Sequence, residues 1–231
     1  MPGTAKLDLY AHLAVLAKAV AHEHRLGLLE LVAQGERSVE VLAAHSSLSL
    51  ANASQHLQQL RRAGLVVGCR RGKFIFYRLA DEAVLGMIAA MRTVAERNVG
   101  EVAHALRAYF HERDQLEPVS RAEVATRMKL GLITVIDVRP KDEFALGHIA
   151  GARNLPLTEL KRHSSKLNRK LEIVAYCRGP YCMLAFEAVA QLRKLRFKAR
   201  RLQDGLPEWR AAGLPIETPA ASAPRICHCP H

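Results

Sequence analysis

The sequence predicts a multidomain chain, with a mainly helical N-terminal domain and a C-terminal α/β domain built on a central parallel sheet. Its 231 residues suffice for two ordinary domains of about 100–200 residues each. Apolar residues recur at helical spacing through most of the first half. The second half carries near-continuous β-branched runs separated by helical stretches, which is the pattern of a parallel sheet covered by helices.

Composition excludes several protein classes. The chain is 49% hydrophobic and 24% charged, which is typical of globular proteins. No run approaches the roughly 18 apolar residues of a membrane span, and residues 1–10 lack the layout of a secretory signal. The five cysteines are odd in number and unevenly spread, unlike a secreted disulfide framework. We therefore expect a cytoplasmic protein that does not bind membranes.

The first 64 residues are expected to form four helices. Gly35 ends the second of them. Ser38 is placed to cap a short third helix, and Ser49 to cap a fourth. The buried face of the fourth helix is expected to consist of Ala53, Leu57 and Leu60.

A β-hairpin and a long helix follow. Residues 65–79 read as two short strands around a turn at Arg71 and Gly72. A helix from about Asp81 to Glu112 closes the domain, and Pro118 marks the linker. Two short helices with a tight connection, followed by a basic hairpin, are the layout of a winged helix-turn-helix.

The second short helix would then enter the major groove of DNA, and its outward polar side chains would meet base edges. Between Glu40 and Asp81 the chain has no acidic residue, so basic side chains there would hold phosphates. A merely solvated basic loop is the alternative. Base-reading candidates are Asn52, Ser54, Gln55, Gln58 and Gln59, and phosphate-holding candidates are Arg61, Arg62, Arg71 and Lys73.

The total charge of +12 is not itself an argument for nucleic acid, because most of it lies elsewhere. Residues 1–117 hold 14 basic and 12 acidic side chains, and the remainder holds 20 and 10.

Residues 16–29, 49–60 and 71–79 are similar to the ArsR-type winged-helix family, and the resemblance covers about residues 9–110. It implies a homodimer, held by the first and last helices, that binds double-stranded operator DNA. It also implies a repressor that releases DNA when a ligand binds.

The chain departs from the metal sites of that family. Val39 and Val41 stand in the region where the resemblance would place arsenic-binding cysteines. His104, His111 and Glu112 on the last helix are candidates for a zinc-type site, and the spacing of seven puts the two histidines on one face. A solvated or core-edge role is the alternative for both, and no cofactor is required by the sequence.

In the second half, residues 132–138, 171–176 and 197–202 are expected to be strands of the parallel sheet. A helix is expected from about Met183 to Leu195. Between the second strand and this helix lies the loop Cys177-Arg178-Gly179-Pro180-Tyr181-Cys182-Met183.

Such a loop can gather backbone N–H groups around one point, next to the positive end of a helix dipole. Both effects favour a thiolate, so Cys177 is expected to be a nucleophile with a lowered pKa. Arg178 would add a fixed charge near the mouth. The alternative is a buried structural cysteine.

Residues 137–156 and 204–215 are close to the most characteristic segments of the rhodanese family, and the resemblance covers about residues 118–218. It implies that Cys177 forms a persulfide and that Cys177 to Cys182 frame the six-residue loop of sulfurtransferases. Asp137 and Arg139 are expected to tie strand ends to neighbouring loops, with Arg139 facing the site as a further option.

Cys182 departs from the rhodanese pattern, which often has arginine or a hydroxyl residue there. A thiol cannot clamp thiosulfate, but it can resolve a modified Cys177 by forming a disulfide. The pair is therefore a candidate catalytic set, with Arg178, and equally a candidate switch. In the tail, Cys227 and Cys229 are soft metal ligands. They belong either to a disordered tail or, with a partner that completes the site, to a zinc site.

The expected domains are a winged helix over 1–112, a linker over 113–119, a rhodanese-like domain over 120–218 and a Cys/His tail over 219–231. The function that fits best is a transcriptional repressor whose second domain senses or transfers sulfane sulfur from a small sulfur donor. The first alternative is a sulfurtransferase that uses the winged helix for dimerisation. The second is a metal-responsive repressor.

Overall fold

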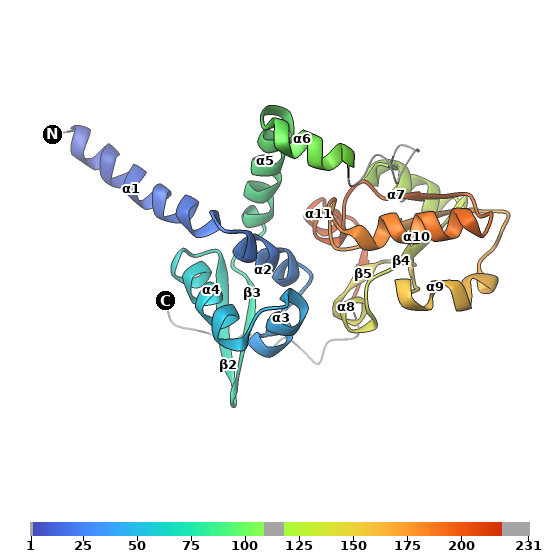
Figure 1. The fold of residues 1–231 in the computed structure, drawn as a ribbon, viewed down its shortest axis with the longest axis horizontal. Coiled ribbons are helices and arrows are strands. Elements are labelled where there is room, and N and C mark those ends of the chain that lie inside the picture. The colour runs from blue at the N-terminus through green and yellow to red at the C-terminus, as the bar shows by residue number, and fades with distance from the viewer. Residues whose placement is uncertain (1, 109–117, 219–231) are drawn as a thin grey trace. The chain divides into compact units, whose positions relative to one another are not determined.

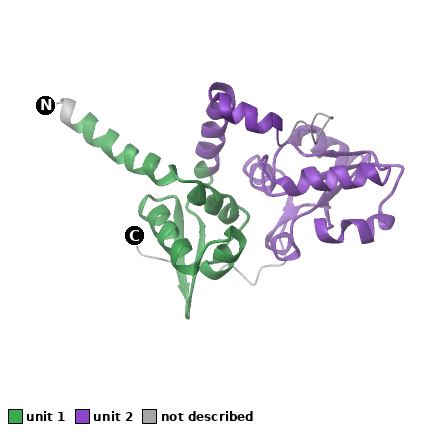
Figure 2. Ribbon diagram, viewed as in Figure 1, with its two compact units in different colours: residues 1–84, 222–231 green, residues 85–221 purple. Residues whose placement is uncertain are grey.

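The computed structural model describes residues 2–108 and 118–218, and the chain divides into two compact units (Figure 2). The first unit runs to Val84, and the second begins at Leu85. The first is a helical unit with a small antiparallel sheet, and the second contains a parallel sheet covered by helices. The predicted fold classes are therefore confirmed.

Four helices build most of the first unit, and they can be followed in Figure 1. They are α1 (Pro2–Val20), α2 (Glu23–Ala33), α3 (Val39–Ser46) and α4 (Leu50–Arg62). Ser38 caps α3, because its hydroxyl oxygen accepts from the Val41 N–H at 3.5 Å. Ser49 caps α4 in the same way, with 3.2 Å to the Asn52 N–H. Both predicted caps are confirmed.

The core of the first unit lies between α2, α3 and α4. Ala53, Leu57 and Leu60 on α4 are fully buried, as predicted. Leu28 on α2 and Leu42 on α3 are equally inaccessible to solvent. This packing fixes which face of α4 is left for a ligand.

A three-stranded antiparallel sheet completes the unit. Strand β2 (Val66–Arg71) pairs with β3 (Phe74–Leu79), and β1 (Arg37–Ser38) pairs with the other edge of β3. The hairpin turn lies at Gly72 and Lys73, one residue later than predicted. Gly72 has a φ of 61°, which glycine adopts without a steric penalty.

The predicted single helix from Asp81 to Glu112 is wrong in its middle. The chain forms α5 (Ala83–Asn98) and α6 (Gly100–Leu106), separated by Val99 in an extended conformation. A β-branched residue followed by glycine is a pair of poor helix formers, which explains the break there. Glu112 lies outside the described residues.

The second unit contains a four-stranded parallel sheet in the order β6-β4-β7-β8. The three predicted strands are present as β4 (Ile133–Asp137), β7 (Glu172–Tyr176) and β8 (Ala199–Arg201). The edge strand β6 (Arg153–Asn154) is two residues long, too short for an apolar pattern to reveal it.

Helices and a short β-pair surround this sheet. The pair is β5 (His148–Ile149) with β9 (Ile216–Glu217), which are antiparallel. The helices are α7 (Arg121–Lys129), α8 (Lys141–Leu146), α9 (Leu157–His163), the 3-10 turn η2 (Ser164–Lys166), α10 (Met183–Lys194) and α11 (Leu206–Ala211).

The sheet has an apolar layer on each face. Ile173 and Ala175 of β7 belong to one layer, and Val174 and Tyr176 belong to the other. Parallel sheets of this kind are buried on both faces, which is why the strands read as continuous apolar runs.

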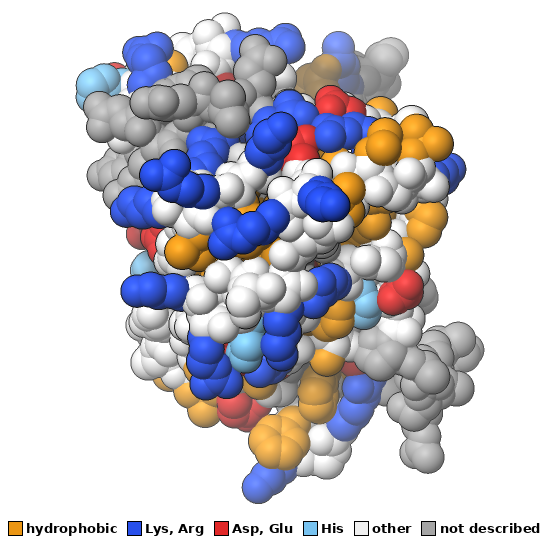
Figure 3. Space-filling model, turned by 90° about the vertical axis from the view of Figure 1, so that its right-hand side faces the viewer, with side chains coloured by type: hydrophobic (Ala, Val, Ile, Leu, Met, Phe, Trp, Pro, Cys, Tyr) orange, Lys and Arg blue, Asp and Glu red, His pale blue; other side chains and the backbone are white. Residues whose placement is uncertain are grey.

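The surface of the molecule is rich in cations. Figure 3 shows Lys and Arg side chains spread over the face that it displays. None of the described helices is long and apolar enough to span a membrane.

Candidate functional site

The thiol loop follows β7 directly and leads into α10. Tyr176 is the last residue of the strand, and α10 begins at Met183. The Cys182 N–H donates to the Gly179 carbonyl at 3.1 Å, which closes a turn inside the loop. The site therefore lies at the carboxyl end of a parallel strand, where α/β sheets commonly bind ligands.

Cys177 and Cys182 are both buried, reduced cysteines, with 2% and 8% of their surfaces exposed. The Cys177 Sγ lies 3.4 Å from the Cys182 carbonyl oxygen and 3.8 Å from the Gly179 carbonyl oxygen. The thiol is therefore placed to donate a hydrogen bond to its own loop, as a protonated sulfur does.

The expected lowering of the Cys177 pKa is wrong for this conformation. Burial raises the pKa of the Cys177 thiol well above its usual value, and the neighbouring Cys182 adds to the rise. A hydrogen bond with the backbone at Ala185 acts in the opposite direction but is outweighed. The packing around the loop thus favours the neutral thiol.

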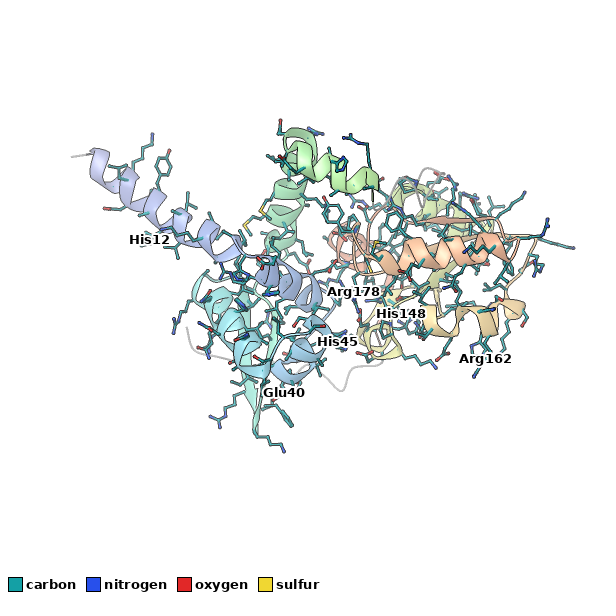
Figure 4. All side chains as sticks on the ribbon, in the orientation of Figure 1. His12, Glu40, His45, His148, Arg162 and Arg178 are labelled. Atoms are coloured by element: carbon teal, nitrogen blue, oxygen red, sulfur yellow. The ribbon has the colours of Figure 1, made fainter. Side chains whose placement is uncertain are left out.

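Figure 4 marks the position of Arg178. Its guanidinium pairs with the carboxylate of Glu143 on α8. Its Nε lies 3.1 and 3.0 Å from the two carboxylate oxygens, and its Nη2 lies 2.6 Å from Oε1. Glu143 is fully buried and the Arg178 side chain is 21% exposed. The charge expected at the mouth of the loop is therefore compensated by an internal carboxylate, 35 positions earlier in the sequence.

A glycine supports the loop from behind. A Cβ on Gly205 would lie 2.3 Å from the Arg178 carbonyl oxygen, so only glycine fits there. The next residue, Leu206, donates its N–H to the Cys177 carbonyl at 3.3 Å. Residue-type reasoning missed both Glu143 and Gly205, although both lie inside the segments that carry the rhodanese resemblance.

Asp137 and Arg139 form a fully buried ion pair after β4. The Arg139 Nε lies 3.0 and 3.1 Å from the Asp137 oxygens, and its Nη2 donates to the Gly147 carbonyl at 2.8 Å. The pair ties the end of the strand to the turn after α8.

Tyr181 is the most exposed residue of the loop, at 39%, and its hydroxyl donates to Glu96 on α5.

The predicted DNA face of the first unit is largely open to solvent. The exposed members are Asn52, Gln55, Gln58, Arg61, Arg62, Arg71 and Lys73, and Ser54 is half-buried. Gln58 Nε2 lies 3.4 Å from the Ser54 hydroxyl oxygen, so these two polar side chains form a pair on α4.

Two members of the predicted face are already engaged inside the unit. Gln59 Oε1 accepts from Arg25 Nη1 at 2.5 Å, which turns this side chain toward α2. Arg71 Nη1 lies 2.7 Å from Glu36 Oε2, and its guanidinium stacks over the Phe76 ring at 4.9 Å. Contacts to DNA by these two residues would compete with internal contacts.

The metal candidates are not brought together among the described residues. His104 is exposed on α6, and His111, Cys227 and Cys229 lie outside the described ranges. In the part of the chain that the structure describes, no three His, Cys, Asp or Glu side chains are arranged to hold a metal ion.

Comparison with known proteins identifies both halves. A family model described as a helix-turn-helix domain matches residues 20–69, and one described as a rhodanese-like domain matches residues 120–212. The biofilm growth-associated repressor of Agrobacterium fabrum is 42% identical over 81 residues, 35% of this chain and 69% of the relative. The solution structure of the homodimeric winged helix-turn-helix domain of Mb0332 from Mycobacterium bovis is 39% identical, with a TM-score of 0.39, and the match covers 41% of this chain and 87% of that one.

A further relative matches along nearly the whole length. The HTH-type transcriptional regulator Rv0324 of Mycobacterium tuberculosis is 40% identical over 212 residues, 92% of this chain and 93% of the relative. The chain therefore belongs to the ArsR-type helix-turn-helix transcriptional regulators that carry a rhodanese-like domain.

Proposed function

We propose that this regulator represses transcription by binding operator DNA as a homodimer, and that it releases DNA when Cys177 takes up sulfane sulfur. The observation that carries the proposal is the pair of buried, reduced cysteines, Cys177 and Cys182, at the two ends of one loop. The winged helix supplies the DNA contact, and the thiol loop supplies the signal.

DNA binding is assigned to α4 and to the β2–β3 hairpin. Asn52, Gln55 and Gln58 are exposed amides on one face of α4, which suits contact with base edges in the major groove. Arg61, Arg62 and Lys73 are exposed cations without a carboxylate contact among the described residues, which suits phosphates.

Dimerisation is assigned in part to α1, whose apolar side chains are unusually open. Leu7, Leu9, Tyr10, Leu13 and Val15 are each more than half exposed. Single exposed apolar residues are ordinary, but five within nine positions of one helix favour burial against a second copy. Analytical ultracentrifugation of the full chain tests this, and a monomer at micromolar concentration would contradict it.

The sulfur chemistry needs two displacement steps. In the first, the Cys177 thiolate attacks the terminal sulfur of a persulfide donor. That sulfur is transferred, so Cys177 becomes a persulfide, and the rest of the donor leaves as a thiolate. In the second, the Cys182 thiolate attacks the Cys177 Sγ, a disulfide forms, and hydrosulfide leaves with the transferred sulfur. Each step is a thiol–disulfide type exchange that keeps atoms and electrons in balance.

The same geometry speaks against a thiosulfate:cyanide sulfurtransferase as the main activity. The Arg178 charge is compensated by Glu143, and Cys182 provides no cation at the end of the loop. We therefore expect low turnover in a thiosulfate:cyanide assay. Turnover that is high and abolished by Cys177→Ser would favour the enzyme hypothesis. Metal bound to chain purified without chelator would favour the metal-responsive one.

Mass spectrometry after treatment with inorganic polysulfide tests the thiol pair. The wild-type chain should pass from a Cys177 persulfide to a Cys177–Cys182 disulfide, and Cys182→Ser should stop at the persulfide. A persulfide that persists in the wild-type chain would remove the resolving role of Cys182. No adduct at Cys177 would remove the proposed signal altogether.

A further inference from the structure

Three histidines gather where α2 begins and packs beside α4. His22 and His24 lie at the N-terminus of α2, and His56 lies on α4. The ring centroids are 4.6 Å apart for His22 and His56, 5.3 Å for His22 and His24, and 5.8 Å for His24 and His56. None of these side chains has a part in the function proposed above.

His22 is the N-cap of α2 in a form that requires a neutral ring. Its Nδ1 accepts from the His24 N–H at 3.2 Å, and a ring nitrogen that accepts carries no proton. The same Nδ1 lies 3.5 Å from Glu23 Oε2. A proton on Nδ1 would therefore exchange the cap for a contact with Glu23. It would also put a positive charge at the positive end of the helix dipole.

The surroundings of His56 disfavour a proton on its ring. Its Nδ1 is buried and, among the described residues, has no hydrogen-bond partner. Burial lowers the pKa of His56, and His22, Arg25 and His24 lower it further, while Glu23 acts in the opposite direction. The neutral ring is thus the one that fits the packed state.

Arg25 makes the cluster part of the support of α4. Its guanidinium donates to Gln59 Oε1 on α4 and to the Ala19 and Lys18 carbonyls at the end of α1, at 2.5, 2.6 and 2.9 Å. One side chain therefore joins α1, α2 and α4. Additional positive charge on His56 would act against this fixed cation.

We propose that the cluster of His22, His24 and His56 is a proton-responsive junction, which supports α2 and α4 while His56 is neutral and loosens them when His56 takes up a proton. The direction of the pH effect on stability follows from the difference in proton binding between the packed and the unfolded states. Because the packed state favours neutral His56, the stabilisation is present above the ordinary histidine pKa of about 6.5 and is lost as the pH falls below that value. Since α4 is the proposed recognition helix, acidification would weaken specific DNA binding through its support rather than through its base contacts.

Hydrogen–deuterium exchange of the full chain at pH 7.5 and pH 5.5 tests the proposal, after correction for intrinsic exchange rates. Peptides that cover α2 and α4 should lose protection about threefold or more at the lower pH in the wild-type chain. The double variant His22→Asn/His56→Gln should keep its protection, because asparagine is a good N-cap at both pH values and neither new side chain titrates. His104→Asn removes an exposed histidine on α6 and should behave like the wild type.

Equal loss of protection in the wild type and the double variant would overturn the proposal, and so would unchanged protection in the wild type at pH 5.5. If the double variant does not fold, His56→Gln alone decides, because it leaves the cap at His22 in place and should reduce the acid loss in α2 and α4. These readouts need neither DNA nor sulfur, so they are independent of the proposed sensing function.

Discussion

The ion pair between Glu143 and Arg178 is expected to hold the thiol loop in place, and Glu143→Gln tests this. The carboxylate is fully buried and receives three hydrogen bonds from the guanidinium. Breaking a buried pair by removing one partner commonly costs about 3–5 kcal/mol. Here Arg178 is 21% exposed and the amide of glutamine still accepts, so we expect about 2–3 kcal/mol of lost unfolding free energy.

The assay is urea denaturation followed by tryptophan fluorescence. Trp209 is the only tryptophan of the chain and is 2% exposed, so its emission reports the second unit alone. Glu159→Gln is the matched control, because Glu159 also pairs with a cation but is 33% exposed and its partner Lys141 is 69% exposed. That control should cost much less stability, because solvent screens an ion pair at the surface.

If Glu143→Gln lost no more unfolding free energy than Glu159→Gln, the buried ion pair would not be what holds the loop in place. Adding Arg178→Met to Glu143→Gln should recover part of the loss, since it removes the uncompensated guanidinium. The loss of unfolding free energy in the double variant should be smaller than the summed losses of Glu143→Gln and Arg178→Met. A larger loss would contradict the idea that the two charges compensate each other.

Four further predictions concern packing and reactivity. Leu57→Ala should destabilise the first unit by about 2–5 kcal/mol in thermal unfolding, because the Leu57 side chain is fully buried between helices. A smaller loss of stability would mean that α4 packs loosely against its neighbours. Gly205→Ala should displace the Arg178 carbonyl and speed iodoacetamide labelling of Cys177, whereas unchanged labelling would show that the loop tolerates a Cβ there. In the wild-type chain, the labelling rate of Cys177 should rise about tenfold per pH unit from pH 7 to 9, because the raised pKa keeps the thiolate a minor species throughout. A plateau of the rate below pH 8 would contradict the effect of burial on this pKa. Cys182→Ser should be labelled faster than the wild type at each pH, since the neighbour that raises the Cys177 pKa is then gone.

The sequence was informative wherever a local rule decides the structure. The caps at Ser38 and Ser49, the buried face of α4 and the three predicted strands each depend on residues within one turn or one strand. The break at Val99 was missed because apolar periodicity continues across it, and only the backbone preference of valine and glycine indicates an end.

The site could be located from the sequence, but its electrostatics could not. The position of Cys177 after a strand was readable, because the strand and the following helix are both local patterns. Its protonation state depends on burial by segments far along the chain, such as the one at Gly205. The partner of Arg178 likewise lies on a different helix, and only tertiary packing brings Glu143 to it.

DNA affinity measured before and after sulfane-sulfur treatment shows whether Cys177 controls the release of DNA. Fluorescence anisotropy with a labelled fragment of the regulated promoter should show tight binding by the reduced wild-type chain and release after polysulfide. Cys177→Ser should bind with the same affinity before treatment and should remain bound after it. Release that is equal in the wild type and in Cys177→Ser would contradict the claim that this thiol carries the signal.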